Sequence, residues 1–142
     1  MPNKISFFVE DIKFRFSEKK KIKEWISNSI ISEGKILKDI SIIFCSDEYL
    51  LKMNNEYLKH DFYTDIITFD YTEGEEISGD LFISIDRVKD NSKEQKVVFE
   101  EELNRVMIHG VLHLLGYKDK VKKDKLLMTQ KEDFYLALLS NS

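Results

Sequence analysis

The sequence has little cysteine, proline or glycine: its 142 residues include one Cys, one Pro and five Gly. The single cysteine, Cys45, excludes a disulfide framework within the chain and a zinc site built from cysteines alone. It lies in an apolar run, so we expect a buried strand thiol and no nucleophile. No run of residues approaches the roughly 20 apolar positions of a membrane span, and residues 1–10 lack the pattern of a signal peptide. These absences predict a cytoplasmic protein with no membrane partner.

The sequence also lacks several motifs of known chemistry. It contains no Gly-x-Ser-x-Gly elbow, no phosphate-binding loop, no dinucleotide fingerprint and no repeat with a period of roughly 20–50 residues. The net charge of −4 argues against a general nucleic-acid coat protein, which would be basic. What is present, 42% hydrophobic and 12% aromatic residues, is typical of a globular chain. Because no linker rich in Pro, Gly or Ser divides it, residues 1–142 are predicted to form a single domain.

Hydrophobic periodicity predicts four strands and a set of helices. The strands fall near residues 5–9, 40–45, 66–71 and 80–85, and the helices near 18–31, 48–57, 86 onward, 97–115 and up to about 139. Ser17 and either Ser46 or Asp47 are candidate caps of the first two helices. The acidic turn at 72–76 would join the last two strands as a hairpin. This order predicts an α+β domain with a four-stranded mixed sheet and helices packed largely on one side.

Two of the three histidines, His109 and His113, lie four residues apart in an apolar helical stretch. This spacing places both imidazoles on one face of a helix, about one turn apart. Gly116 follows, where glycine can take the left-handed conformation that ends a helix, and Asp119 comes three residues later. Two ligands from a central C-terminal helix and a third from the returning chain would form a three-ligand metal site with a fourth position for water.

Structural alternatives remain open on these residues alone. His109 and His113 could be core histidines with satisfied ring nitrogens, and Asp119, between two lysines, could be an ordinary solvated charge. A zinc peptidase with this pattern carries Glu directly after its first histidine as the general base. That position is Gly110 here, which disfavours proteolysis.

The histidine block at 109–117, H-G-V-L-H-L-L-G-Y, closely resembles the signature of the YbeY-type endoribonucleases, the rRNA maturation factors of bacteria. Two weaker blocks agree with the same family, and all three lie in the family's order. One block runs from Asn54 through Asp61 and Thr64-Asp65 to Phe69, and the other is Gly79 to Ser84. The resemblance spans about residues 40–139.

The resemblance implies a zinc-dependent hydrolase that cuts single-stranded RNA, with ligands at His109, His113 and residue 119. It implies a role in maturing the 3′ end of small-subunit (16S) ribosomal RNA and in ribosome quality control. The implied partners are ribosomal RNA and the small ribosomal subunit or its proteins. Metal ions of this kind acidify bound water, which would then hydrolyse the phosphodiester.

The chain departs from the family pattern near the implied site. Asp119 stands in place of the third His, Lys118 in place of the Asp before it, and Leu58 in place of an Arg. Aspartate still binds zinc, and as a harder ligand than histidine it should widen tolerance of Mn²⁺ or Mg²⁺. Lys59, beside Leu58, is the candidate catalytic cation, although it lacks the bidentate fork of Arg.

Candidate substrate contacts surround the histidine block. Residues 118–125 hold five Lys and two Asp, a local excess of three positive charges on an acidic chain. Such a run can follow RNA phosphates, or it can be a solvated helix start. Tyr117 could stack on a base or fill a core or turn position, and His60 is a further candidate contact. The candidate phosphate contacts are Lys118, Lys120, Lys122 and Lys123.

Two other functions fit the same residues. One is a metal-dependent hydrolase of another substrate, such as an amide or a small phosphoester. The other is a ribosome-associated binding factor whose metal is structural and whose catalysis is weak or lost. Asp119 and Leu58 are the features that favour the binding factor.

Overall fold

The computed structural model describes residues 4–60 and 62–141, so Asp61, part of the family pattern above, lies outside the described residues. The order of elements is the predicted one, strand, helix, strand, helix, strand, strand and then helices. The strands are β1 (Ile5–Val9), β2 (Ile36–Cys45), β3 (Ile66–Asp70) and β4 (Glu76–Ser84). The helices are α1 (Lys19–Ser32), α2 (Asp47–Leu58), α3 (Ile85–Gln95), α4 (Phe99–Leu114) and α5 (Lys122–Ser140).

The four strands form one mixed sheet in the order β1-β2-β4-β3. The pairs β1–β2 and β2–β4 are parallel, and β3–β4 is antiparallel. Parallel neighbours need a long crossover, which α1 supplies between β1 and β2. The antiparallel pair is joined at the acidic turn, where Glu73 and Glu76 exchange two backbone hydrogen bonds of 3.1 and 3.0 Å. The predicted α+β class, mixed sheet and hairpin are therefore confirmed.

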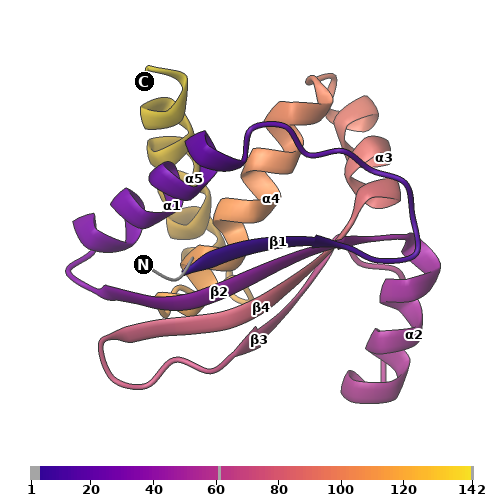
Figure 1. The fold of residues 1–142 in the computed structure, drawn as a ribbon, viewed down its shortest axis with the longest axis horizontal. Coiled ribbons are helices and arrows are strands. Elements are labelled where there is room, and N and C mark those ends of the chain that lie inside the picture. Colours follow the sequence, from indigo (N-terminus) through magenta and orange to yellow (C-terminus); the bar gives the residue numbers. More distant parts are fainter. Residues whose placement is uncertain (1–3, 61, 142) are drawn as a thin grey trace.

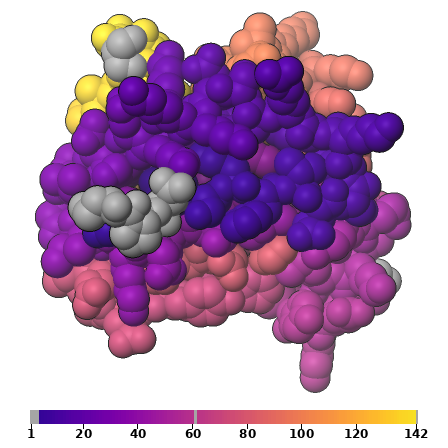
Figure 2. All heavy atoms as spheres, viewed as in Figure 1, coloured from indigo at the N-terminus to yellow at the C-terminus, as the bar shows by residue number. Residues whose placement is uncertain are grey.

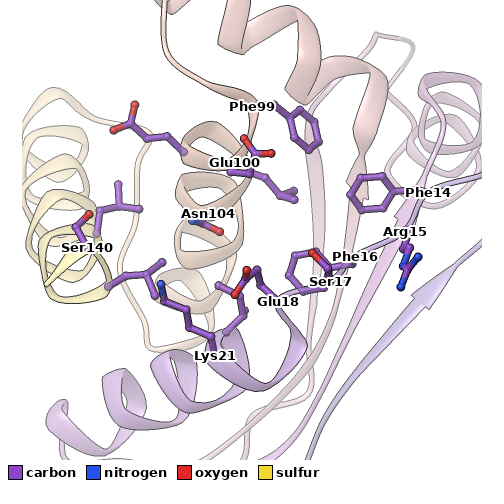
Figure 3. A pocket seen from close by; sticks show the side chains of 15 residues that line it. Phe14, Arg15, Phe16, Ser17, Glu18, Lys21, Phe99, Glu100, Asn104 and Ser140 are labelled. Carbon is purple, nitrogen blue, oxygen red and sulfur yellow. The ribbon is translucent and has the colours of Figure 1, made fainter. Parts of the chain in front are cut away.

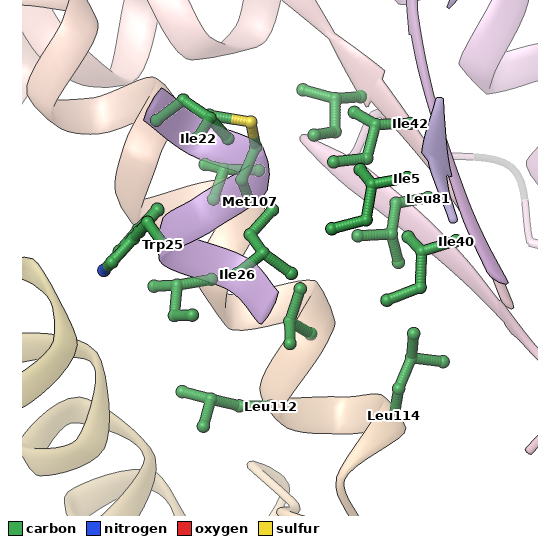
Figure 4. Packing of buried hydrophobic residues seen from close by; sticks show 14 of the residues in the cluster. Ile5, Ile22, Trp25, Ile26, Ile40, Ile42, Leu81, Met107, Leu112 and Leu114 are labelled. Atoms are coloured by element: carbon green, nitrogen blue, oxygen red, sulfur yellow. The ribbon is translucent and has the colours of Figure 1, made fainter. Parts of the chain in front are cut away.

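Helices α1, α3, α4 and α5 lie on one side of the sheet and α2 on the other (Figure 1). The main core fills the space between the sheet and the helices α1 and α4. Figure 4 shows Trp25 and Ile26 of α1 and Met107 of α4 on one side of this space, with strand residues such as Ile42 on the other. A smaller cluster of Cys45, Leu50 and Ile67 lies beneath α2, which projects from one corner of the molecule (Figure 2).

Helix α4 packs closely on the sheet because each of the two carries a glycine at the contact. A Cβ atom added to Gly110 of α4 would lie 2.7 Å from the Ile66 Cδ1 atom, and one added to Gly79 of β4 would lie 2.7 Å from the Leu114 Cδ2 atom. Gly110 follows His109 directly and faces the core. A larger side chain there would enter the core and could not serve as a general base beside the histidines. None of the helices among the described residues is long and apolar enough to cross a bilayer.

Backbone pairing and capping correct the predicted boundaries. Strands β2 and β4 begin earlier than predicted, because residues 36–39 and 76–78, which mix apolar and polar side chains, pair with each other. Ser17 does not cap α1, whose N-cap is Glu18 without a side-chain hydrogen bond. Ser46 does cap α2, accepting a hydrogen bond of 3.1 Å from the Tyr49 amide. The Cys45 thiol is buried, and burial raises its pKa to about 12, as expected for an inert strand residue.

Candidate metal centre

The C-terminal end of α4 is a glycine-terminated turn that sends the chain back past the histidines. Gly116 adopts a φ of +103°, which favours glycine. The Gly116 amide donates to the His113 carbonyl and the Tyr117 amide to the Leu112 carbonyl, both at 3.0 Å. These two bonds form the Schellman pattern, which satisfies the last carbonyls of the helix. The predicted left-handed glycine is confirmed, and the turn brings Asp119 back to the helix.

His109, His113 and Asp119 meet at a single point. The Nε2 atoms of the two histidines lie 3.1 Å apart, and each lies 3.2 Å from the Asp119 Oδ2 atom. Among the described residues, these three form the one group of His, Cys, Asp or Glu side chains that could hold a metal ion. The three side chains come from one helix and one loop, so little backbone rearrangement separates them from a ligand geometry.

The spacing of these atoms fits a tetrahedral metal ion. With metal–ligand distances of about 2.0–2.1 Å, ligand atoms in a tetrahedral zinc site lie about 3.3 Å apart. The observed triangle, with edges of 3.1–3.2 Å, is close to one face of such a tetrahedron. Three protein ligands would leave a fourth position for water or substrate, as in zinc sites that act on substrates.

The ring nitrogens that face away from this point identify the tautomer of each histidine. The His113 Nδ1–H donates to the Tyr117 carbonyl at 3.0 Å, and a carbonyl oxygen can only accept. The His109 Nδ1–H donates to the Glu132 carboxylate at 2.6 Å. The Nε2 atom of each neutral ring is therefore an acceptor, as is the Asp119 oxygen. A bound cation would join three such atoms at this separation, as expected of a metal site.

The buried Glu132 carboxylate that holds His109 is part of an ionic network. Its other oxygen accepts from Arg105 at 2.7 Å, and Arg105 also donates to Asp133 at 2.6 Å. Burial alone would lower the pKa of His109, but the Glu132 carboxylate, assisted by Asp119 and Asp65, raises it above its ordinary value. The network thus fixes the ring and increases its basicity, as carboxylate partners of metal-binding histidines do.

The triad opens into a cleft of about 650 Å³ between the end of α2, β3 and the loop after α4. Two of the predicted substrate contacts, His60 and Lys120, line this cleft, as does Leu58. The structure does not bring Lys59 there: it lies exposed at the C-cap of α2 with a φ of +56°. The other predicted phosphate contacts, Lys118, Lys122 and Lys123, are exposed outside the cleft lining.

The Tyr117 side chain is fixed by contacts of both its ring and its hydroxyl. Its ring packs against the core cluster, and its hydroxyl donates to the Glu33 carboxylate at 2.6 Å. Lys131 lies over the same ring, with its Nζ atom 5.6 Å from the centroid. The ring is thus held by core and polar contacts, which fits the turn role better than the stacking role.

Sequence reasoning missed Glu132, Phe62 and the role of Asp65. Glu132 lies 23 residues from His109, and no local pattern connects the two. Phe62 and Asp65 line the cleft beside the triad. Burial raises the pKa of Asp65 against the opposing influence of His109. The only signal for Asp65 in the sequence is its place in a weak family block.

A second cavity, of about 420 Å³, lies at the opposite end of α4. Figure 3 shows Phe14, Phe16 and Phe99 around it, with charged side chains such as Lys21 and Glu100. None of the triad residues lines it. The chemistry predicted from the sequence therefore belongs to the cleft.

Comparison with known proteins agrees with this geometry. A family model described as Endoribonuclease YbeY matches residues 4–140. A relative from Flavobacterium psychrophilum, named Endoribonuclease YbeY, is 54% identical over 134 residues, covering 94% of this chain and 95% of its own length. A relative of the same name from Karelsulcia muelleri is 46% identical over 135 residues, covering 95% of both.

The fold also has a solved counterpart. The solution structure of a Thermotoga maritima protein matches with a TM-score of 0.67 and 26% identity, covering 95% of this chain and 88% of that one. The resemblance predicted from three sequence blocks is confirmed by the family model over nearly the whole chain. With relatives of this identity over most of both lengths, the chain belongs to the Endoribonuclease YbeY family.

Proposed function

We propose that this protein is a metal-dependent endoribonuclease that hydrolyses single-stranded RNA at the His109–His113–Asp119 centre. The observation that carries the proposal is the meeting of three acceptor atoms within 3.2 Å of one another at an open cleft. Relatives named Endoribonuclease YbeY support the substrate class. By the same resemblance we propose maturation of the 16S rRNA 3′ end and ribosome quality control in the cytoplasm. The small ribosomal subunit or its proteins would be the partners.

Zinc is the metal we propose, at one ion per chain. A bound zinc ion would acidify a coordinated water and polarise a phosphoryl oxygen. The histidines would hold it through Nε2 and Asp119 through Oδ2, and Glu132 and the Tyr117 carbonyl would keep both rings aligned. Because Asp119 is a harder ligand than histidine, we expect Mn²⁺ or Mg²⁺ to be accepted as well. Strict zinc preference in a competition titration would contradict that expectation.

Cationic side chains would stabilise the charge that develops on the phosphate. Of the candidate lysines, Lys120 is the best placed, because it lines the cleft and Lys59 does not. The exposed lysines Lys118, Lys122 and Lys123 would extend the contact to neighbouring phosphates. Tyr117 would contribute through the backbone and ring contacts described above, without stacking on a base.

An unpaired base would stack on the aromatic pair at the mouth of the cleft. The rings of His60 and Phe62 are stacked, with centroids 5.1 Å apart and an interplanar angle of 20°. Phe62 is 56% exposed. Buried Asn54 holds both residues: its side chain donates to the Phe62 carbonyl at 2.9 Å, and its carbonyl accepts from the His60 amide at 3.1 Å. Ordered, exposed aromatic rings are the usual platforms for unstacked RNA bases.

Metal content and RNA cleavage test the proposal together. We would measure zinc by mass spectrometry and cleavage of an unstructured RNA in the wild type, His113→Ala and Asp119→Ala. The expected result is about one zinc per chain in the wild type, with cleavage and zinc lost in His113→Ala and zinc reduced in Asp119→Ala. A wild type that binds no metal, even after reloading with Zn²⁺, Mn²⁺ or Ni²⁺, would remove the catalytic proposal. The exposed Phe134→Ala serves as a control on a different surface.

A ribosome-associated binding factor is the second candidate, because Leu58 lines the cleft where the family pattern has Arg. The two candidates differ in what His113→Ala does. Loss of cleavage with RNA binding retained favours the enzyme, whereas co-sedimentation with ribosomes without metal-dependent cleavage in the wild type favours the binding factor. Cleavage of a small phosphodiester or amide, with RNA left intact, would instead indicate a hydrolase of another substrate.

The proposed phosphate-binding lysines have a test of their own. Removing one lysine that neutralises a phosphate reduces the slope of log affinity against log salt by about 0.7 for single strands. The triple variant with Ala at Lys120, Lys122 and Lys123 should therefore lower the slope by up to roughly 2. A triple variant of exposed lysines outside the cleft, Lys19, Lys20 and Lys38, should leave it unchanged. Equal slopes in both variants would remove the lysine run from the binding surface.

A further inference from the structure

We propose that Glu33, at the end of α1, is a positioning residue for the metal centre and acts through Tyr117 on His113. The inference rests on the proposed function only in assuming that the triad holds a metal ion. Glu33 is far from the triad in sequence and belongs to none of the family blocks described above. Its role is visible only in the contacts that join α1, the loop after α4 and α5.

The Glu33 carboxylate receives three hydrogen bonds from two segments of the chain. Its Oε1 atom accepts from the Tyr117 hydroxyl at 2.6 Å, and its Oε2 atom accepts from Lys131 at 3.3 Å and from the Tyr135 hydroxyl. The side chain is only 14% exposed. Burying a carboxylate is costly unless hydrogen bonds replace its water, and here all three donors do so.

The backbone of Glu33 is itself fixed, so the carboxylate is a rigid anchor. Its amide donates to the Ser29 and Ile30 carbonyls at 3.2 Å, which makes it the C-cap of α1, and Gly34 follows with a φ of +76°. Because α1 packs into the main core through residues such as Trp25, this anchor does not move independently of the domain.

Tyr117 links Glu33 to the metal centre. Its hydroxyl is tied to Glu33, and its carbonyl accepts the Nδ1–H of His113 at 3.0 Å. Tyr117 also stands between His113 and Asp119, two of the three proposed ligands, so its position determines where the chain turns toward Asp119. Without the hydrogen bond to Glu33, the ring would keep only its core packing and its contact with Lys131, and the carbonyl would align His113 less tightly.

The carboxylate is charged at neutral pH, as this role requires. Burial opposes ionisation of Glu33, but the hydrogen bonds from Tyr117, Tyr135 and Lys131 outweigh it and keep the pKa below the ordinary 4.5. Lys131 and Glu132 are neighbours on α5, yet they support different histidines. Lys131 reaches the Glu33–Tyr117 pair, and Glu132 binds His109.

The two tyrosines permit a matched test, because each makes one hydrogen bond to Glu33. Tyr117→Phe removes the hydrogen bond that connects Glu33 to Tyr117, the residue whose carbonyl binds His113. Tyr135→Phe removes a hydrogen bond that connects Glu33 only to α5. Zinc affinity would be measured by chelator competition, and the cobalt(II) absorption spectrum would report the ligand geometry. We expect Tyr117→Phe and Glu33→Ala to change the cobalt spectrum and to weaken zinc binding by about tenfold. This is the lower end of the effect of removing a residue that hydrogen-bonds to a metal ligand. Tyr135→Phe should lower the thermal midpoint yet leave zinc affinity within about twofold of the wild type.

Two outcomes overturn the inference. Zinc affinity and a cobalt spectrum unchanged in Tyr117→Phe would show that Glu33 only joins helices. An equal loss in Tyr135→Phe and Tyr117→Phe would show an effect of general stability. Neither outcome contradicts the proposed function, which requires only that the wild type bind metal and cleave RNA. If the wild type binds no metal ion at all, both proposals fall. A wild type that binds metal and cleaves RNA, with zinc affinity unchanged in Tyr117→Phe, removes only the inference about Glu33.

Discussion

The two histidines of the candidate metal centre lie one helical turn apart, yet different parts of the chain orient their rings. His109 is held by a charged side chain from another helix, Glu132, at 2.6 Å. His113 is held by a neutral backbone carbonyl of its own loop, that of Tyr117, at 3.0 Å. The first support depends on how α5 packs against α4, and the second on how the chain turns at Gly116.

This difference determines which changes can weaken each ligand. A charge-assisted hydrogen bond is about twice as strong as a neutral one, so the His109 support is the stronger of the two. It is also the more vulnerable, because one side-chain substitution removes it. The His113 support is a backbone carbonyl, so no side-chain substitution deletes it. A substitution weakens it only by shifting the loop, as loss of the bond between Tyr117 and Glu33 would.

The largest effect is expected from Glu132→Ala, which would break the stronger support. It leaves His109 without a partner at Nδ1 and removes the buried partner of Arg105. Loss of a partner behind a metal ligand typically weakens metal binding 10–100-fold, so zinc affinity should fall by about 10–100-fold. The lost hydrogen bonds to a charged group should lower the free energy of unfolding by about 2 kcal/mol. Chelator competition and urea unfolding measure the two effects.

Asp133→Ala is the matched control for Glu132. It removes the other carboxylate bound to Arg105, but Asp133 is 60% exposed and does not contact a histidine. An exposed ion pair contributes about 0–1 kcal/mol, and zinc affinity should not change. Equal zinc affinities in Glu132→Ala and Asp133→Ala would show that the comparison between the two histidines is wrong.

The local part of this centre could be predicted from the sequence, and the long-range part could not. The i, i+4 spacing of the histidines, the glycine turn and Asp119 lie within one short segment, so helix geometry alone brings them together. Glu132 reaches His109 only because α5 packs on α4, and Glu33 reaches Tyr117 across 84 residues. No periodicity encodes such pairs.

The fold divides in the same way. Strand positions follow from runs and alternation of apolar residues, which is why the four strands and their order along the chain were predictable. The first residues of β2 and β4 form strands because they pair with each other, and that pairing leaves no signal within either segment. The cap predicted at Ser17 failed because the chain enters α1 at Glu18 through a backbone conformation that offers no side-chain bond.

A smaller effect is expected from Gly116→Ala, which would test the support of His113. Nothing lies within 4 Å of an added Cβ, so the cost comes from the φ of +103° and should be about 1–2 kcal/mol of unfolding free energy. Gly74→Ala is the control: it also has open space and a positive φ, +60°, but lies in the hairpin turn. Both variants should lose stability, and only Gly116→Ala should weaken zinc binding. Intact zinc affinity in Gly116→Ala would mean that the loop path does not hold His113.

The smallest effect concerns pH and separates the Glu33 anchor from the rest of the His113 support. Because hydrogen bonds hold the pKa of Glu33 below 4.5, its contribution to stability is fully present above that value and is lost as the pH falls through the folded-state pKa. In metal-free protein, Glu33→Gln should therefore be less stable than the wild type by about 1 kcal/mol at pH 7. The difference should shrink below pH 4.5, which urea unfolding at pH 7, 5, 4 and 3 would measure. A difference that stays constant across this range would mean that the carboxylate charge contributes nothing, and that only the shape of the side chain holds Tyr117 and, through it, His113.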